Sequence, residues 1–191
     1  ASGDSIFSVT VTGSQTNVGS SDNIASAAVI KDGGVDVSSN YDVTYVKGTL
    51  TVTKATGETL NIANYNDIYD SEAHSISVLN LIAGDVVYYS LNNVDWQLTK
   101  PLFTNVTSAQ TVYVKVSNDN YDDRTGTGTV TITARPITIT ANSDSKVYDG
   151  TPLTNNGYAL TLGTLAAGET FGSVTVIGSQ TNVGSSANIP S

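Results

Sequence analysis

Residues 8–21 read SVTVTGSQTNVGSS, and residues 173–186 read SVTVIGSQTNVGSS. The two copies are offset by 165 residues, and a weaker match around them relates residues 1–26 to residues 166–191. Self-similarity at a fixed period is the signature of a repeat architecture. A chain that finishes in the motif with which it starts is expected to be a section of a longer tandem array. Such arrays serve reach and multivalency more often than chemistry.

A second, weaker repeat lies inside the first. The motif Asn-Tyr-Asp, followed by Gly-Thr-x-Thr-x-Thr, occurs at residues 40–53 and again 80 residues later, at residues 120–133. At the other end of the module, Val-Tyr-Asp-Gly at residues 147–150 matches Ile-Tyr-Asp-Ser at residues 68–71. These matches predict that two module types of similar length alternate. The predicted division is 1–54, the C-terminal part of one type; 55–135, a complete module of the other; and 136–191, the N-terminal part of the first type again.

Alternation of apolar and polar residues predicts β-strands along the whole chain. Val112, Val114 and Val116 alternate with Tyr113 and Lys115. Period-two alternation rich in β-branched residues is typical of strands with one buried face. The same pattern occurs at Val9 and Val11, Leu50 and Val52, Ile76 and Val78, Val130 and Ile132, Ile137 and Ile139, and Leu160 and Leu162. Turn-forming pairs such as Asp-Gly and Asn-Asn separate these stretches, and no helical apolar stripe lasts three turns.

The expected fold is therefore all-β, built from tandem small immunoglobulin-like β-sandwich modules. A β-grasp-like module is the alternative, and it would need one helix for which the sequence offers no segment. A module of about 80 residues is small for a hydrophobic core, so its few large side chains are expected to carry that core. In the middle module these side chains are Trp96, Tyr88 or Tyr89, Phe103 and Tyr113.

Composition excludes several classes of function. The chain has no Cys, one His, 8 Lys plus Arg, 17 Asp plus Glu and a formal net charge of −9. Without Cys it forms neither a disulfide nor a Cys-ligated metal site. Excess negative charge argues against binding to nucleic acid or to anionic lipid. No apolar run approaches the ~20 residues of a membrane-spanning helix. No signal peptide is visible, as expected for a section from the middle of an array.

Two groups of motifs resemble known repeats. Residues 137–157 (ITITANSDSKVYDGTPLTNNG), with GSQTNVGSS and with NYDVTYVKGTLTVTK at residues 40–54, resemble the YDG-type and MBG-type repeats of large bacterial surface adhesins. The middle module, with VVYYSLNNVDW and GTGTVTIT, is similar to the Ig-like repeats that alternate with them in surface proteins of Gram-positive bacteria. It departs from that pattern at residues 70–71, where Asp-Gly is typical, and at residues 90–93, where a Gly-containing turn is usual. The resemblance implies an extracellular location at the bacterial cell surface or cell wall, and adhesion without catalysis.

Polar candidates for a catalytic or metal site are few. His74 is the only imidazole, so a hydrolase triad or zinc site would lack partners, and a surface strand residue is the simpler interpretation. The acidic segment at residues 118–123 could supply oxygen ligands to calcium, but it does not follow the usual calcium-loop spacing. The alternative is a turn in which Asn and Asp cap their own backbone. We assign no catalytic, cofactor-binding or metal-binding residue, and we expect no cofactor.

Three further features have a chemical and a structural interpretation. A Lys–Asn or Lys–Asp isopeptide crosslink would need a buried lysine beside an acid. The candidate donors are Lys54, Lys100, Lys115 and Lys146. Trp96 and the tyrosines could stack on a sugar, although a module so poor in large residues needs Trp96 in its core. Residues 105–107 (Asn-Val-Thr) form a glycosylation sequon that, in a bacterial protein, is better read as a turn.

The divided repeat predicts self-association. Each terminal part would expose unpaired strand edges, so one copy is expected to complete another, head to tail or by strand exchange. The expected function is a non-catalytic extracellular stalk or spacer in adhesion, whose modules unfold separately under load. The alternative is a module that binds a host glycan or host protein through residues 55–135. We expect no enzyme activity, no nucleic-acid partner and no membrane insertion.

Overall fold

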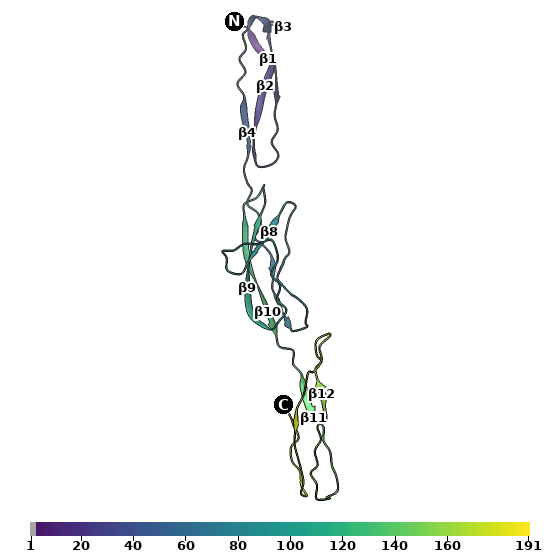
Figure 1. Ribbon diagram of the computed structural model, residues 1–191. Helices are drawn as coiled ribbons and strands as arrows, with labels where there is room; N and C mark the ends of the chain where they lie inside the picture. Colours follow the sequence, from purple (N-terminus) through teal and green to yellow (C-terminus); the bar gives the residue numbers. More distant parts are fainter. Residues whose placement is uncertain (1–2) are drawn as a thin grey trace. The chain divides into compact units, whose positions relative to one another are not determined.

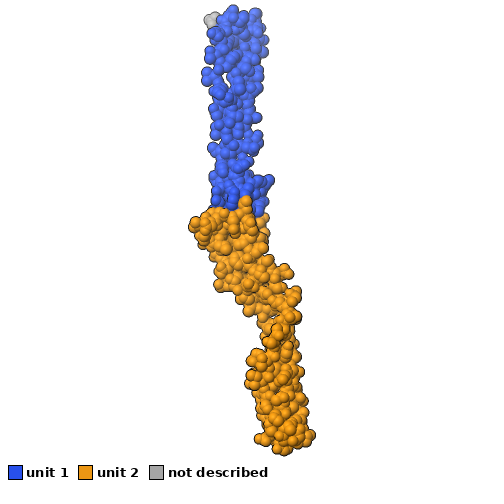
Figure 2. Space-filling model, viewed as in Figure 1, with its two compact units in different colours: residues 1–60, 80–88, 115–126 blue, residues 61–79, 89–114, 127–191 orange. Residues whose placement is uncertain are grey.

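The computed structural model describes residues 3–191, and within that range it confirms the predicted all-β class. It contains fourteen strands and one short 3-10 turn, Ser38–Asn40, and none of the described residues forms an α-helix. The chain divides into two compact units (Figure 2). The first comprises residues 1–60, 80–88 and 115–126, and the second comprises residues 61–79, 89–114 and 127–191. Every sheet lies within residues 4–52, 62–133 or 138–190. We call these ranges the N-terminal, middle and C-terminal segments.

The N-terminal sheet is built around one long strand. That strand, β2 (Gly19–Asp32), pairs antiparallel with β1 (Asp4–Thr12), β3 (Val35–Asp36) and β4 (Gly48–Val52) (Figure 1). The alternating residues Val9 and Val11 were expected to face a core, but they are exposed. The strands form as predicted, yet this sheet has little packed against that face. Alternation therefore predicted the strand correctly and its burial wrongly.

The middle segment holds the best-formed core. Its strands are β5 (Ile62–Ala63), β6 (Tyr65–Ile68), β7 (Ser77–Val78), β8 (Val86–Ser90), β9 (Thr107–Ser117) and β10 (Arg124–Thr133). One sheet has the order β6-β10-β9-β8, and β5 and β7 form a second, smaller one. Figure 1 labels β8, β9 and β10 of the larger sheet. A Cβ added at Gly128 of β10 would lie within 2.8 Å of side-chain carbons of both Ile62 and Ile76, so the small sheet packs closely on β10.

Branched aliphatic side chains, not aromatic ones, form this core. Six of them are at most 1% exposed: Ile76, Val112, Val114, Val116, Val130 and Ile132. The expectation of an aromatic core is wrong, because Trp96, Tyr88, Tyr89, Phe103 and Tyr113 are only half-buried. Successive side chains of a strand point to opposite faces. With the three valines of β9 turned into the core, Tyr113 must lie on the other face of the sheet.

The C-terminal segment contains two small antiparallel sheets. The first pairs β11 (Thr138–Ala141) with β12 (Tyr158–Leu162), and the second pairs β13 (Val176–Ile177) with β14 (Ile189–Pro190). A backbone bridge between Leu153 and Gln180 joins the intervening loops. Within residues 3–191 no helix is long and apolar enough to cross a membrane.

Candidate functional site

The duplicated motif adopts the same local structure in both copies. In the N-terminal copy, Ser21 Oγ donates to Ser14 O (2.8 Å); in the C-terminal copy, Ser186 Oγ donates to Ser179 O (3.0 Å). The Gln15 and Gln180 side chains each donate to the carbonyl two residues later, at 2.7 Å. The strand register is also shared, because Val11 pairs with Ala25 and the equivalent Val176 pairs with Pro190. The hairpin and its side-chain hydrogen bonds are therefore common to both copies.

The surroundings of the two copies differ at one edge. In the N-terminal copy, residues 19–23 belong to β2 and pair with β4, with Gly19 opposite Val52 and Asn23 opposite Gly48. In the C-terminal copy, the equivalent residues 184–188 belong to no strand and pair with none in the described part of the chain. Apart from the replacement of Asp22 by Ala187, the same edge sequence is thus paired in the first copy and unpaired in the second.

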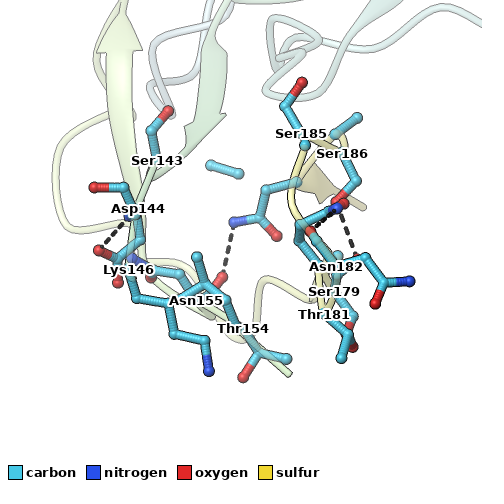
Figure 3. A pocket seen from close by; sticks show the side chains of 18 of the residues that line it. Ser143, Asp144, Lys146, Thr154, Asn155, Ser179, Thr181, Asn182, Ser185 and Ser186 are labelled. Atoms are coloured by element: carbon cyan, nitrogen blue, oxygen red, sulfur yellow. Dashed lines mark hydrogen bonds between the residues drawn. The ribbon is translucent and has the colours of Figure 1, made fainter. Parts of the chain in front are cut away.

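A groove of about 680 Å³ lies at this open edge, and we call it the C-terminal groove. One wall is formed by residues 141–146 with Tyr148, the other by residues 178–188, and residues 153–155 complete the lining. Figure 3 shows Ser143 and Asp144 on one side and Ser185 and Ser186 on the other. The Asn188 side chain joins the lining segments, because its Nδ2 donates to Asn142 O (2.9 Å) and to Asn155 O (2.8 Å).

Backbone, hydroxyl and amide groups line the C-terminal groove together with apolar surface of similar extent. Its charged side chains are Asp144 and Lys146. Lys146 is engaged outside the lining by Asp149, at 2.8 Å. This ammonium group, together with hydrogen bonds from Thr151, holds the pKa of the Asp149 carboxyl well below its usual range. Such a lining suits the recognition of an extended polypeptide backbone, because strand edges bind through N–H and C=O groups.

The N-terminal segment is joined to the middle segment by direct hydrogen bonds. Val18 N donates to Asn120 Oδ1 (2.9 Å), and Lys54 Nζ donates to Asn118 O (3.0 Å). Ala55 N donates to Asn120 O (3.0 Å), and Asp122 N donates to Ala55 O (2.9 Å). We call these contacts the first junction. They hold the linker at Lys54 and Ala55 against the middle segment.

A buried ion pair is connected to the first junction through Asn118. Arg124 pairs with Asp85, and both side chains are more than 90% buried. Burial of Asp85 opposes its ionisation, but hydrogen bonds from Ile82 N, Asn118 Nδ2 and Arg124 outweigh burial and hold the pKa of the carboxyl below its ordinary value. The Asn118 Oδ1 atom accepts from Asn120 N, so this network fixes the loop that receives the N-terminal segment.

The middle segment is joined to the C-terminal segment in a similar way. Tyr69 OH donates to Glu169 Oε1 (2.5 Å), and Ser71 Oγ donates to Ala167 O (3.4 Å). Arg135 Nε donates to Tyr69 O (2.8 Å), and its Nη1 donates to Thr164 Oγ1 (3.3 Å). The hydrogen bond to Glu169 raises the pKa of the Tyr69 phenol. We call these contacts the second junction.

His74 is more enclosed than a surface strand residue. Its Nε2 atom lies 2.8 Å from Asp70 Oδ1, and its ring stacks on Tyr65 with 4.1 Å between centroids. Its backbone pairs with Phe103 in an isolated bridge. The hydrogen bond with His74, together with one from Glu72 N, holds the pKa of Asp70 below its ordinary value. The cluster ties the bend at residues 70–74 to the strand that carries Tyr65.

The acidic segment at residues 118–123 forms the turn that was the alternative to a calcium site. Asn118 caps the backbone of Asn120, and Asn120 is used in the first junction. Among residues 3–191, no group of three or more His, Asp or Glu side chains is arranged to hold a metal ion. The parallel between residues 40–42 and 120–122 was visible in the sequence, but the role of Asn120 in joining two segments was not.

The lysines proposed as crosslink donors are not buried. Lys54 and Lys100 are exposed and donate to the carbonyls of Asn118 and Ile76. Lys115 lies 5.3 Å from the centroid of the Tyr88 ring, on the outer face of the sheet. Lys146 is 26% exposed. None of the four therefore has the desolvated setting that a spontaneous crosslink needs. Asn105 of the sequon is exposed at a bend.

The chain has no match among protein-family models, and none among curated protein sequences.

Proposed function

We propose that this chain is a non-catalytic segment of a bacterial surface adhesin, where it acts as an extracellular stalk or spacer. The two junctions carry the proposal. Each replaces a free linker with several direct hydrogen bonds between neighbouring segments. Each such bond contributes about 0.5–1.5 kcal/mol at most, so we expect the bonds of a junction together to restrict the motion of the linker. Modules fixed in this way transmit position along an array.

The sequence supports this proposal independently. The resemblance of residues 137–157 and 40–54 to YDG-type and MBG-type repeats implies a cell-surface location. A net charge of −9 keeps repeated modules soluble and apart. The two packed sheets of the middle segment support an immunoglobulin-like sandwich as the finer description of its fold.

Distance measurements between spin labels test the spacer proposal. Because the chain has no Cys, the exposed residues Val46 and Asp119 can be replaced by labelled cysteines without background. The expected result is a narrow distance distribution, as narrow as that of a control pair placed within residues 4–52. Asn120→Ala combined with Lys54→Ala should broaden the distribution across the junction and leave the control pair unchanged. A broad distribution in the unaltered chain would replace rigid spacing with loosely tethered modules.

Recognition of a host glycan or protein by the middle segment is the competing function. Trp96 and the other aromatic side chains named above are half-buried there, which reduces the ring face available to a sugar. Screening the whole chain against a glycan array tests this alternative. Saturable binding that is lost in Trp96→Ala, with the fold preserved, would favour recognition over spacing.

A further inference from the structure

We propose that the C-terminal groove is an acceptor site for a β-strand, and that its occupant is residues 47–54 (KGTLTVTK) of a second copy of this chain. The occupant would run between the two walls and hydrogen-bond to both. This assignment does not rest on the spacer function, since a strand acceptor would exist whatever the parent protein does.

The wall at residues 184–188 has its precedent in the N-terminal copy. There the equivalent residues 19–23 pair antiparallel with β4, over five residue pairs from Gly19 opposite Val52 to Asn23 opposite Gly48. The hairpin that presents this edge is already in the same conformation in the C-terminal copy, including the left-handed glycine, with φ of 137° at Gly19 and 144° at Gly184. Transfer of the register places Val52 of the incoming strand opposite Gly184, and Gly48 opposite Asn188.

The wall at residues 144–147 has its precedent in the middle segment. The shorter repeat aligns residues 144–147 with β6, and it aligns β4 with residues 128–132, in the second half of β10. In the middle segment β10 lies between β6 and β9, and it pairs parallel with β6, with Val130 opposite Tyr65 and Thr133 opposite Ile68. Transfer of this register places Leu50 of the incoming strand opposite Asp144, and Thr53 opposite Val147. Two separate precedents thus place one strand between the same two walls.

The groove offers what such a strand needs. Residues 184–187 and 142–147 are exposed, and neither stretch belongs to a strand. Leu153 and Ala141 line the site and provide apolar surface, so the alternating Leu50 and Val52 have apolar neighbours on one face. Figure 3 shows labelled polar side chains along both walls. At one end Asn188 bridges the walls through Asn142 O and Asn155 O, so entry of Gly48 opposite Asn188 requires these two hydrogen bonds to open.

A second copy can supply the strand because β4 is paired on one edge only. Within residues 3–191, β2 is its single strand neighbour. In the C-terminal groove of another copy it would keep an equivalent antiparallel partner and gain the parallel one. The donor also exposes a complementary surface: Val11 is 57% exposed, whereas the equivalent Val176, in the copy next to β11, is 9% exposed. Each copy therefore offers the part that the other leaves unpaired.

Peptide binding tests the acceptor directly. The probe is KGTLTVTK with blocked ends, added to the complete chain. At saturation, amide hydrogen exchange at residues 184–188 and 144–147 should slow by at least about tenfold, while residues 112–116 should not change. The control peptide KGLTVTTK has the same composition but shifts the apolar residues to the other face of the strand, so its affinity should be at least about tenfold weaker. Failure of the first peptide to protect the two walls, or equal binding of the control, would overturn the acceptor site.

An extended chain tests the occupant. Because residue 191 is equivalent to residue 26, a copy of residues 27–54 appended after residue 191 supplies the strand within the same molecule. The extended chain should no longer bind the peptide, because its groove is filled. In analytical ultracentrifugation the unaltered chain should associate at high micromolar concentration, and the extended chain should not. Peptide binding that persists in the extended chain would overturn the assigned strand, and a strictly monomeric unaltered chain would overturn the second copy as its source.

Discussion

The N-terminal and C-terminal copies of the duplicated motif share most of their sequence, their hairpin register and their side-chain hydrogen bonds, yet only the first forms a full strand along residues 19–23. Two differences lie outside residues 8–21. No strand equivalent to β4 pairs with residues 184–188 in the described part of the chain, and Ala187 replaces Asp22, which pairs with Lys47 in the first copy. Strand propensity and pattern prepare a backbone edge for pairing, and a neighbouring strand completes it. Two nearly identical edges thus show how strongly strand formation depends on a neighbouring strand.

Removal of the β4 partner should make the first copy behave like the second. The double change Leu50→Pro and Thr51→Pro removes at least one donor that faces β2, since adjacent residues of a strand point their N–H groups to opposite edges. Amide exchange at residues 19–23 should accelerate by roughly 100-fold, equivalent to about 2.7 kcal/mol of lost protection. Hydrogen-exchange NMR measures this, with residues 184–188 as the internal control. Unchanged exchange at residues 19–23 would mean that the motif holds its edge without β4.

A second change should damage both copies alike. Gly13 and Gly178 are equivalent, and a Cβ at either would lie close to a backbone oxygen: 2.7 Å from Asp22 O, or 2.9 Å from Ala187 O. Gly13→Ala and Gly178→Ala should each destabilise their own hairpin by about 1–3 kcal/mol, because backbone must move to make room. Native-state hydrogen exchange measures the opening free energy of each hairpin. A large loss of stability in one hairpin and none in the other would show that the glycine does not approach the opposite backbone equally closely in the two copies.

A third pair of changes should separate the copies. Val11→Thr and Val176→Thr place the same hydroxyl at equivalent positions, one exposed and one buried. The buried change should cost about 1–3 kcal/mol of local stability, because the hydroxyl loses water without gaining an assured partner. The exposed change should stay within about 0.5 kcal/mol. The opening free energies from hydrogen exchange compare the two variants directly. Equal losses of stability would contradict the difference in burial between Val11 and Val176.

The smallest expected effect comes from pH. Asp4 and Glu169 are equivalent, and each accepts a hydrogen bond from a tyrosine, Tyr41 and Tyr69 respectively. The bond from Tyr41 lowers the pKa of Asp4, so its contribution should be present above the ordinary value of 3.8 and be lost as pH falls below it. The bond to Glu169 raises the pKa of Tyr69, so that contribution should be present below pH 10 and be lost as pH rises further.

Variants assign these two pH dependences. Tyr69→Phe should remove the alkaline loosening of the second junction and leave the acid response of Asp4 intact. In a chemical-shift titration, residues 164–169 report on the second junction, and residues 4–8 report on Asp4 and β1. An alkaline response that survives in Tyr69→Phe would assign it to another group.

The sequence predicted the positions of the strands well, but it predicted poorly which strand faces are buried. Alternation correctly placed Val112, Val114 and Val116 on one buried face of β9, because a strand's two faces follow from the backbone alone. It gave the same prediction for Val9 and Val11, which are exposed, because alternation marks a face without saying what packs on it. The aromatic core was wrong for a related reason: ranking residues by size ignored the face that Tyr113 must take on β9.

The candidate sites were harder to read. The importance of Asn120 depends on a contact with Val18, 102 residues away, and no local pattern carries such a contact. The groove, in contrast, was implicit in the two repeat periods. The offset of 165 residues relates one wall to residues 19–23, and the offset of 79 relates the other wall to β6. With the offset of 80, which relates β4 to β10, the pairing seen in those copies then identifies the proposed occupant.

The parallel pairing of β6 with β10 has a mechanical consequence. Residues 65–68 enter the middle segment and residues 130–133 leave it, and the two strands lie side by side in the same direction. If the ends are pulled apart, the strands slide in shear, so all four residue pairs resist together and none can open singly like a zipper. Resistance to extension would therefore be set by this short ribbon of backbone, at the point where the chain enters and leaves.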